Sequence, residues 1–180
     1  MKKAVIKLTA EEMASYLALP TPKKALEEIT AYLVHEVGIP LDRARRIARE
    51  AYYDTLYDIG RELWETLGIY IRGYDEKGNF YLMPLSGLNW ESVIEELAYA
   101  TGFRERFLEE AKFALKDEGK KPTTANIIKW GLDTLHHLFV AGKVNFVAAF
   151  PPLYAVGADW EEVYTRVLDA NLRRAIGILL

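Results

Sequence analysis

The sequence predicts a mainly α-helical protein, a multi-helix bundle that carries one small β-hairpin at about residues 69–83. Apolar residues recur with helical spacing over most of the chain. The spacing changes to alternation on the two sides of Asp75–Asn79, a segment with the residues of a tight turn. With 180 residues, 51% of them hydrophobic, the chain is long enough to bury a sizeable core.

The first half of the chain is expected to form a short strand at Ala4–Leu8, three helices and then the hairpin. Thr9 and Glu12 form a capping box at the start of the first helix. Prolines start helices or interrupt them, and glycines end them. The residues that delimit the three helices in this way are Thr9, Pro20, Pro22, Gly38, Pro40 and Gly68.

The break at Pro84–Gly87 is the predicted boundary between residues 1–86 and 87–180, two regions that can also pack as a single domain. The second region is expected to be helical throughout. Its predicted helices begin near Asn89, Gly102, Thr123 or Thr124, Val144 and Asp159. Pro151–Pro152 is expected to bend or break the fourth of them.

Composition excludes several kinds of site. The chain has no cysteine and three histidines, so disulfides and thiolate metal sites are ruled out. The net charge of −3 argues against a dedicated nucleic-acid coat. There is no apolar run of membrane-spanning length, no signal-peptide pattern and no glycine-rich phosphate loop. We therefore expect a cytoplasmic protein, and the charged, cysteine-free composition is compatible with a thermophile.

Acidic and imidazole side chains suggest one candidate site. Asp133, His136 and His137 lie three and four residues apart, which places them on one helix face. Glu105 and Glu109 share a face of an upstream helix in the same way. Two helices that present carboxylates to each other can hold Mg²⁺. Phosphate oxygens of a bound nucleotide would then complete the coordination shell of the metal ion.

The order of these residues resembles the all-α nucleotide pyrophosphatases, in particular the dimeric dUTPases. The match continues into Gly157–Glu162 and then Asn171, with Arg173 and Arg174 close by. The resemblance implies Mg²⁺-dependent hydrolysis of a nucleoside triphosphate. It implies that carboxylates bind the metal and that the C-terminal polar residues contact phosphates. The implied metal ligands are Glu105, Glu109 and Asp133, and the implied phosphate ligands are Asn171, Arg173 and Arg174.

The family's pattern is incomplete in this chain. Trp130 and Gly102 replace two of its glutamates, and Ala170 replaces a lysine. Three interpretations stay open: a site rebuilt with neighbouring carboxylates, a relative without catalytic activity, and a plain amphipathic helix whose Asp133 pairs with a lysine.

A second candidate site lies at the start of the long helix, where Arg43, Arg45, Arg46 and Arg49 cluster. Two helices followed by a hairpin resemble a winged DNA-binding arrangement, and the glycine and alanine spacing of residues 26–83 is similar to the histone-like HU fold. This implies a non-enzymatic module that binds DNA or an acidic protein. The alternative is a solvated helix face.

Tyrosines and a tryptophan on the same helix favour a homo-oligomer, with a dimer expected.

Overall fold

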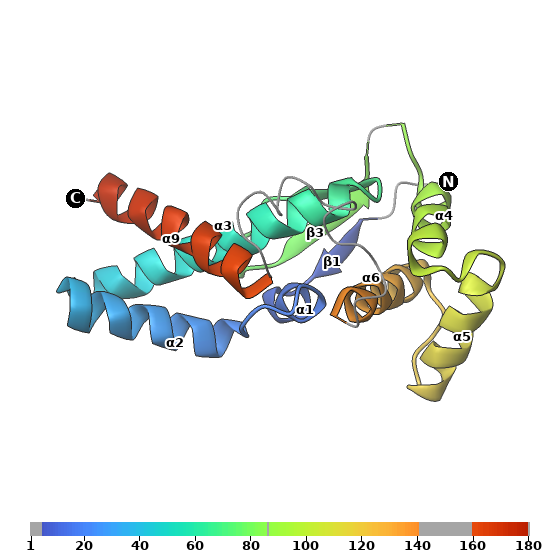
Figure 1. The fold of residues 1–180 in the computed structure, drawn as a ribbon, viewed down its shortest axis with the longest axis horizontal. Helices are drawn as coiled ribbons and strands as arrows, with labels where there is room; N and C mark the ends of the chain where they lie inside the picture. Colours follow the sequence, from blue (N-terminus) through green and yellow to red (C-terminus); the bar gives the residue numbers. More distant parts are fainter. Residues whose placement is uncertain (1–4, 86, 141–159, 180) are drawn as a thin grey trace.

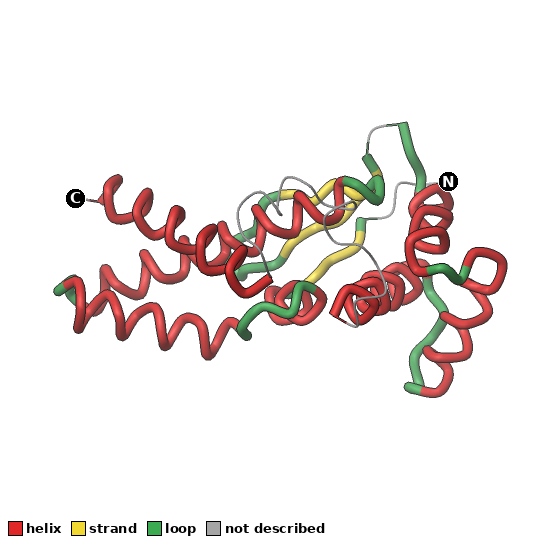
Figure 2. The backbone as a smooth tube through the Cα atoms, viewed as in Figure 1, coloured by secondary structure: helices red, strands yellow, loops and turns green. Residues whose placement is uncertain are grey.

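The computed structural model describes residues 5–85, 87–140 and 160–179, and its backbone is mainly helical (Figures 1 and 2). Seven α-helices in these residues accompany a small antiparallel sheet, which confirms the predicted fold class. The elements, in chain order, are β1 Ile6–Leu8, α1 Ala10–Tyr16, α2 Pro22–Tyr32, the π-helical turn η1 Leu33–Val37, α3 Leu41–Glu65, β2 Ile69–Arg72, β3 Phe80–Pro84, α4 Trp90–Thr101, the 3-10 turn η2 Arg104–Arg106, α5 Phe107–Asp117, α6 Thr124–Val140 and α9 Trp160–Leu179.

The sheet has three antiparallel strands in the order β1-β3-β2. The predicted hairpin is confirmed, since β2 pairs with β3 and Ile71 lies opposite Leu82. The short N-terminal strand is also present, and it extends the hairpin on the other side of β3, with Leu8 opposite Phe80. All four of these side chains are fully buried. The apolar face of the sheet therefore contributes directly to the core.

The turn of the hairpin rests on α3. The carboxylate of Asp75 accepts hydrogen bonds from the backbone N–H groups of Lys77 (3.0 Å) and Asn79 (2.9 Å). Gly78 has a φ of +79°, and a Cβ at that position would lie 2.8 Å from the ring of Tyr53 on α3. Only glycine meets both requirements. The close packing fixes the hairpin against the helix.

The helices of the first half begin next to the predicted residues, but α1 ends at Tyr16, before Pro20, and α3 ends at Glu65, before Gly68. Thr9 and Glu12 form the expected capping box of α1, with both hydrogen bonds at 3.1 Å. Pro22 occupies the first position of α2. The helix widens into the π-helical turn η1 before Gly38 ends it with a φ of +82°. The π-helical turn was not predicted.

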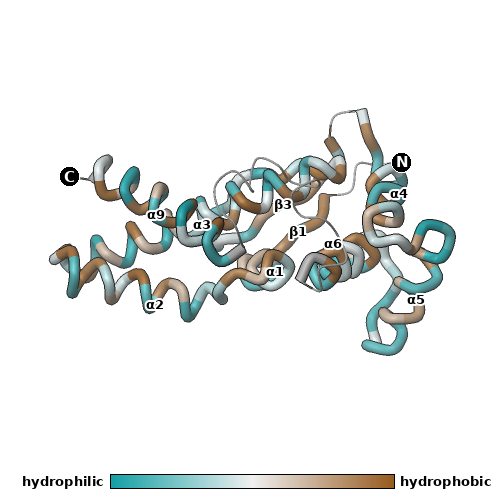
Figure 3. Tube along the Cα trace, in the orientation of Figure 1, coloured by the Kyte–Doolittle hydropathy of each residue, from teal (hydrophilic) through white to brown (hydrophobic). Residues whose placement is uncertain are grey.

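The long helix α3 is central to the first half. It packs against α2, α9 and β2, and Figure 1 shows it between α2 and α9. In Figure 3, hydrophobic residues recur along α2 and α3 between hydrophilic ones, as amphipathic helices require. The buried residues of α3 include Ala44, Ile47, Ala48, Ala51, Tyr52, Leu56, Ile59, Leu63 and Trp64.

In the second half, α4 and α6 pack closely, and α5 lies against α6. The carbonyl oxygen of the Asn89 side chain caps α4 through the Ser92 N–H at 2.9 Å, as predicted. One cluster of buried residues extends from β1 to α9, so it crosses the predicted boundary near residue 86. The predicted helix from Val144 and the predicted Asp159 cap lie outside the described residues. Among the described helices, none combines the length and the apolar character needed to cross a membrane.

Candidate functional site

The three predicted metal ligands lie on three different elements. Glu105 is in η2 and Glu109 is in the first turn of α5, and both are exposed. Asp133 is half-buried on α6 and forms an ion pair with His137, with 3.4 Å between the carboxylate and Nε2. Within the part of the chain that the structure describes, no three His, Cys, Asp or Glu side chains lie close enough to hold a metal ion together. Glu105, Glu109 and Asp133 are therefore not gathered into such a group among the described residues.

Asp133 instead lines a polar cavity of about 350 Å³ between α1 and α6. Its neighbours there include Tyr16 and Glu12, and the Glu12 carboxylate pairs with Lys129 at 3.0 Å. Burial raises the pKa of Tyr16, and the nearby carboxylates of Glu12, Asp133 and Glu118 raise it further. This cavity brings a phenol and several paired charges together, yet most of its charged groups already have partners of their own.

The predicted phosphate ligands on α9 take part in contacts within the protein. Asn171 is only 5% exposed, and its amide nitrogen donates to the Thr55 hydroxyl (3.0 Å) and to the Asp58 carboxylate (3.1 Å) on α3. Its carbonyl oxygen accepts from Arg174 at 2.6 Å. Arg173 points outward and pairs with Asp169 one turn earlier, at 3.1 Å.

This polar network continues to the hairpin. Arg174 also lies 3.6 Å from the Asp54 carboxylate, which accepts a hydrogen bond of 2.8 Å from the Tyr74 hydroxyl. Burial raises the pKa of Asp54, although the contacts with Tyr74 and Arg174 act in the opposite direction. The network of Asn171, Arg174, Asp54 and Tyr74 therefore holds α9, α3 and the hairpin region together.

The four arginines of α3 have different surroundings. Arg43, Arg45 and Arg46 are exposed and make no hydrogen bond or ion pair with another described residue. Arg49 is half-buried, donates a hydrogen bond to the backbone carbonyl of Glu76, and stacks 4.8 Å from the ring centre of Tyr53. Arg49 thus belongs to the contact between α3 and the hairpin, whereas the other three guanidinium groups are available to a partner.

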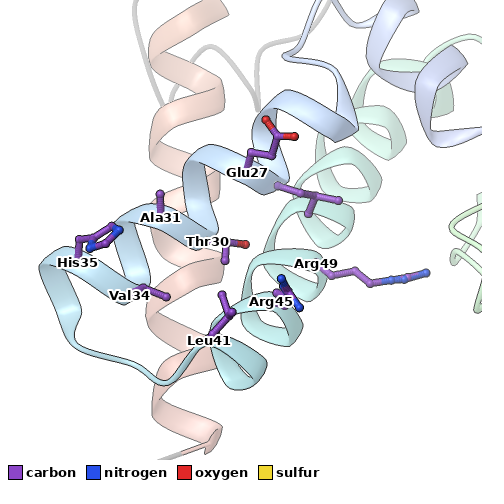
Figure 4. Close-up of a pocket in the computed structure, with 9 residues that line it drawn as sticks. Glu27, Thr30, Ala31, Val34, His35, Leu41, Arg45 and Arg49 are labelled. Carbon is purple, nitrogen blue, oxygen red and sulfur yellow. The ribbon is translucent and has the colours of Figure 1, made fainter.

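An open groove of about 610 Å³ lies beside these arginines, between α2 and α3. Figure 4 shows side chains of α2 and η1 along one wall and side chains of α3 along the other, with Arg49 extending away from them. The apolar lining comes from Leu26, Ala31, Val34 and Leu41, and the polar lining from Glu27, Thr30, His35, Arg45 and Arg49. The groove offers an apolar floor with a cationic group at its edge.

Sequence reasoning found the arginines of this site but missed its α2 wall. No residue of α2 was predicted to belong to a site. The buried row of α2 and η1 is Ala25, Ile29 and Leu33, while Leu26 and Val34 lie one position further along the chain and are only half-buried. The available signal was the width of the apolar side of this helix, which is larger than one neighbouring helix can cover.

Comparison with models of known protein families, with curated proteins and with solved structures found no match to this chain. The resemblances to nucleotide pyrophosphatases and to the HU fold therefore stay predictions.

Proposed function

We propose that this protein is a non-enzymatic binding module that holds an acidic protein partner on the Arg43–Arg49 face of α3. The observation that supports this most is the position of Arg45, an exposed guanidinium without a described partner at the edge of an apolar groove. Arginine forms strong, bidentate hydrogen bonds with carboxylates. Arg43 and Arg46 are exposed on other sides of the same helical turn and add positive charge near Arg45.

A protein partner is favoured over DNA because the site is only locally basic. DNA binding depends on several simultaneous phosphate contacts, so it needs a broad cationic surface. Here Glu27 lies within the groove and the whole chain has a net charge of −3. In the hairpin, Arg72 lies 5.8 Å from the ring centre of Tyr81, and the carboxylates of Asp75 and Glu76 offset the positive charges of Arg72 and Lys77. The apolar floor of the groove can also bury hydrophobic side chains of a protein partner, whereas it offers no hydrogen bond or charge to a phosphate backbone.

The pyrophosphatase prediction has less support from the geometry. Its Mg²⁺ site would need Glu105, Glu109 and Asp133 to converge, and the described residues offer no such cluster. Asn171 would have to exchange three internal hydrogen bonds for contacts with phosphate. Mg²⁺ binding and nucleotide hydrolysis therefore remain predictions from the resemblance alone.

The proposal is tested by titrating the protein with a fluorescent polyglutamate peptide and, separately, with a labelled DNA duplex, at low and at physiological salt. We expect peptide binding that weakens about tenfold in Arg45→Ala plus Arg46→Ala, because each exposed charge pair contributes about 0.2–1 kcal/mol. The matched control is Arg61→Ala plus Lys112→Ala, which also removes two positive charges. Arg61 lies about 24 Å from Arg45 along α3, and Lys112 lies on α5 outside the groove lining.

Two outcomes would count against the proposal. Equal weakening by the control and by the arginine pair would mean that only net charge matters. Tighter binding of the duplex than of the peptide, lost in the same arginine variants, would assign the face to nucleic acid.

A further inference from the structure

The groove between α2 and α3 has the shape and chemistry to receive one helix of a partner. We infer that its occupant is an amphipathic helix that places apolar side chains in the groove and a carboxylate at Arg45. This inference rests on the proposed function, since it takes the acidic protein partner as given and specifies how that partner is held.

Backbone hydrogen bonding favours a helix over an extended segment. Both walls of the groove are helices, whose N–H and C=O groups bond within each helix. None of the described lining residues belongs to a strand, so they offer an extended peptide no strand edge to pair with. A helix satisfies its own backbone groups before it docks. It can therefore lie against the apolar floor without leaving polar groups unpaired.

The length of the groove matches a short helical segment. The lining residues of the α2 wall run from Leu26 to His35, which is about 13 Å at the rise of a helix. Helical anchors at positions i, i+3 or i+4 and i+7 span about 10 Å. Three apolar side chains of a partner would thus meet Leu26, Val34 and Leu41, the last of which is 48% exposed.

Charge sets the composition of that helix. Arg45 lies on the α3 wall one turn beyond Leu41, so a carboxylate beside the apolar row of the partner would reach it. Arg49 lines the same wall, but its guanidinium is already bonded to the Glu76 carbonyl. Arg45 is therefore the guanidinium that we assign to the partner's carboxylate.

Charge also argues against a second copy of this chain on the same surface. A symmetric dimer built on this groove would gather Arg45 and Arg49 of both copies at one interface, where each copy offers one described acidic lining residue, Glu27. Like charges in contact oppose association. An acidic helix from a different protein meets no such repulsion.

The test is a selection from a display library of 18-residue helical peptides with randomised surface positions, using the whole protein as bait. We expect the enriched peptides to combine apolar residues at i, i+3 or i+4 and i+7 with glutamate or aspartate beside them. Binding of a selected peptide should weaken on the order of tenfold in Leu41→Ser and in Arg45→Ala. It should be unchanged in Leu108→Ser, a leucine 44% exposed on α5.

The possible results separate the two proposals. Enriched peptides that are acidic without helical spacing, and that tolerate Leu41→Ser, would overturn the helix-in-groove inference and leave the arginine face standing. Peptides that bind without sensitivity to either Arg45→Ala or Leu41→Ser would overturn both. A bound peptide that is extended by NMR would also overturn the inference. Unchanged circular dichroism and unfolding midpoint of the Leu41→Ser protein would show that it still folds.

Discussion

Replacing Asn171 by aspartate exchanges a buried amide for a carboxyl group at the contact between α9 and α3. The substitution removes the NH₂ group that donates to Thr55 and to Asp58. The bond to the Thr55 hydroxyl contributes about 0.5–1.5 kcal/mol and the bond to the Asp58 carboxylate about 1.5–3 kcal/mol. Their loss alone should therefore lower the free energy of unfolding by about 2–4.5 kcal/mol. Because the shape of the side chain is nearly unchanged, no cavity adds to this figure.

The new carboxyl group should also make stability depend on pH. It would lie about 3 Å from the Asp58 carboxylate in a site that is 5% exposed, so burial and repulsion raise its pKa in the folded state. Arg174 opposes this, but its side chain is 59% exposed and its effect is screened. When the pKa of a carboxyl group is higher in the folded protein than in the unfolded chain, the free energy of unfolding falls as pH rises above the pKa in the unfolded chain, about 3.9.

Urea denaturation at pH 4 and at pH 7 measures this effect, with the wild-type protein as the reference at each pH. The loss of unfolding free energy in Asn171→Asp, relative to wild type, should grow between pH 4 and pH 7 by about 1.4 kcal/mol for each unit by which the pKa is raised. Asn89→Asp is the control, since Asn89 is an exposed helix cap and aspartate caps equally well. An ordinary surface substitution costs roughly 0.5 kcal/mol. A loss of unfolding free energy below that value, equal at both pH values, would contradict a stabilising role of the Asn171 hydrogen bonds.

Three further predictions concern packing, backbone strain and metal binding. Gly131→Ala would place a Cβ 2.9 Å from Leu97 and 3.0 Å from Phe107, so overpacking of about 1–3 kcal/mol should outweigh a helix gain of about 1 kcal/mol. Gly177→Ala, with nothing within 4 Å, should not be destabilising in the same thermal melts. Ala18→Gly relieves a left-handed residue with a φ of 50° and should stabilise by up to about 1 kcal/mol in urea titrations; a loss would contradict this strain. Finally, Mg²⁺ with dUTP should leave the unfolding midpoint unchanged by calorimetry, and a clear rise would favour the pyrophosphatase prediction.

Local chemistry explains which parts of the fold the sequence could predict. The capping box of Thr9, the glycine that ends η1 and the turn at Asp75 all depend on residues within a few positions of one another. Their partners are therefore visible in the sequence itself. The hairpin and the helix boundaries near these residues were predicted for that reason.

Long-range contacts explain what could not be predicted. Asn171 finds Thr55 across 116 positions of the chain, and Arg49 finds the Glu76 carbonyl across 27. Neither pairing leaves a periodic pattern, so Asn171 resembled a phosphate ligand and Arg49 resembled a free cation. The π-helical turn at Leu33–Val37 was missed because a helix that widens keeps the same apolar composition.

The layout of α3 keeps binding and folding separable. Leu41 and Arg45 lie on its N-terminal part, and Arg45 is ten residues, or about 15 Å, from the buried contact of Thr55 with α9. Groups more than about 7–10 Å apart without shared partners contribute nearly additively to stability. Arg49 is different, since the hairpin and Tyr53 depend on it, and changing it would disturb the fold. Arg45 and Leu41 are therefore the positions at which a loss of binding reports on the groove itself.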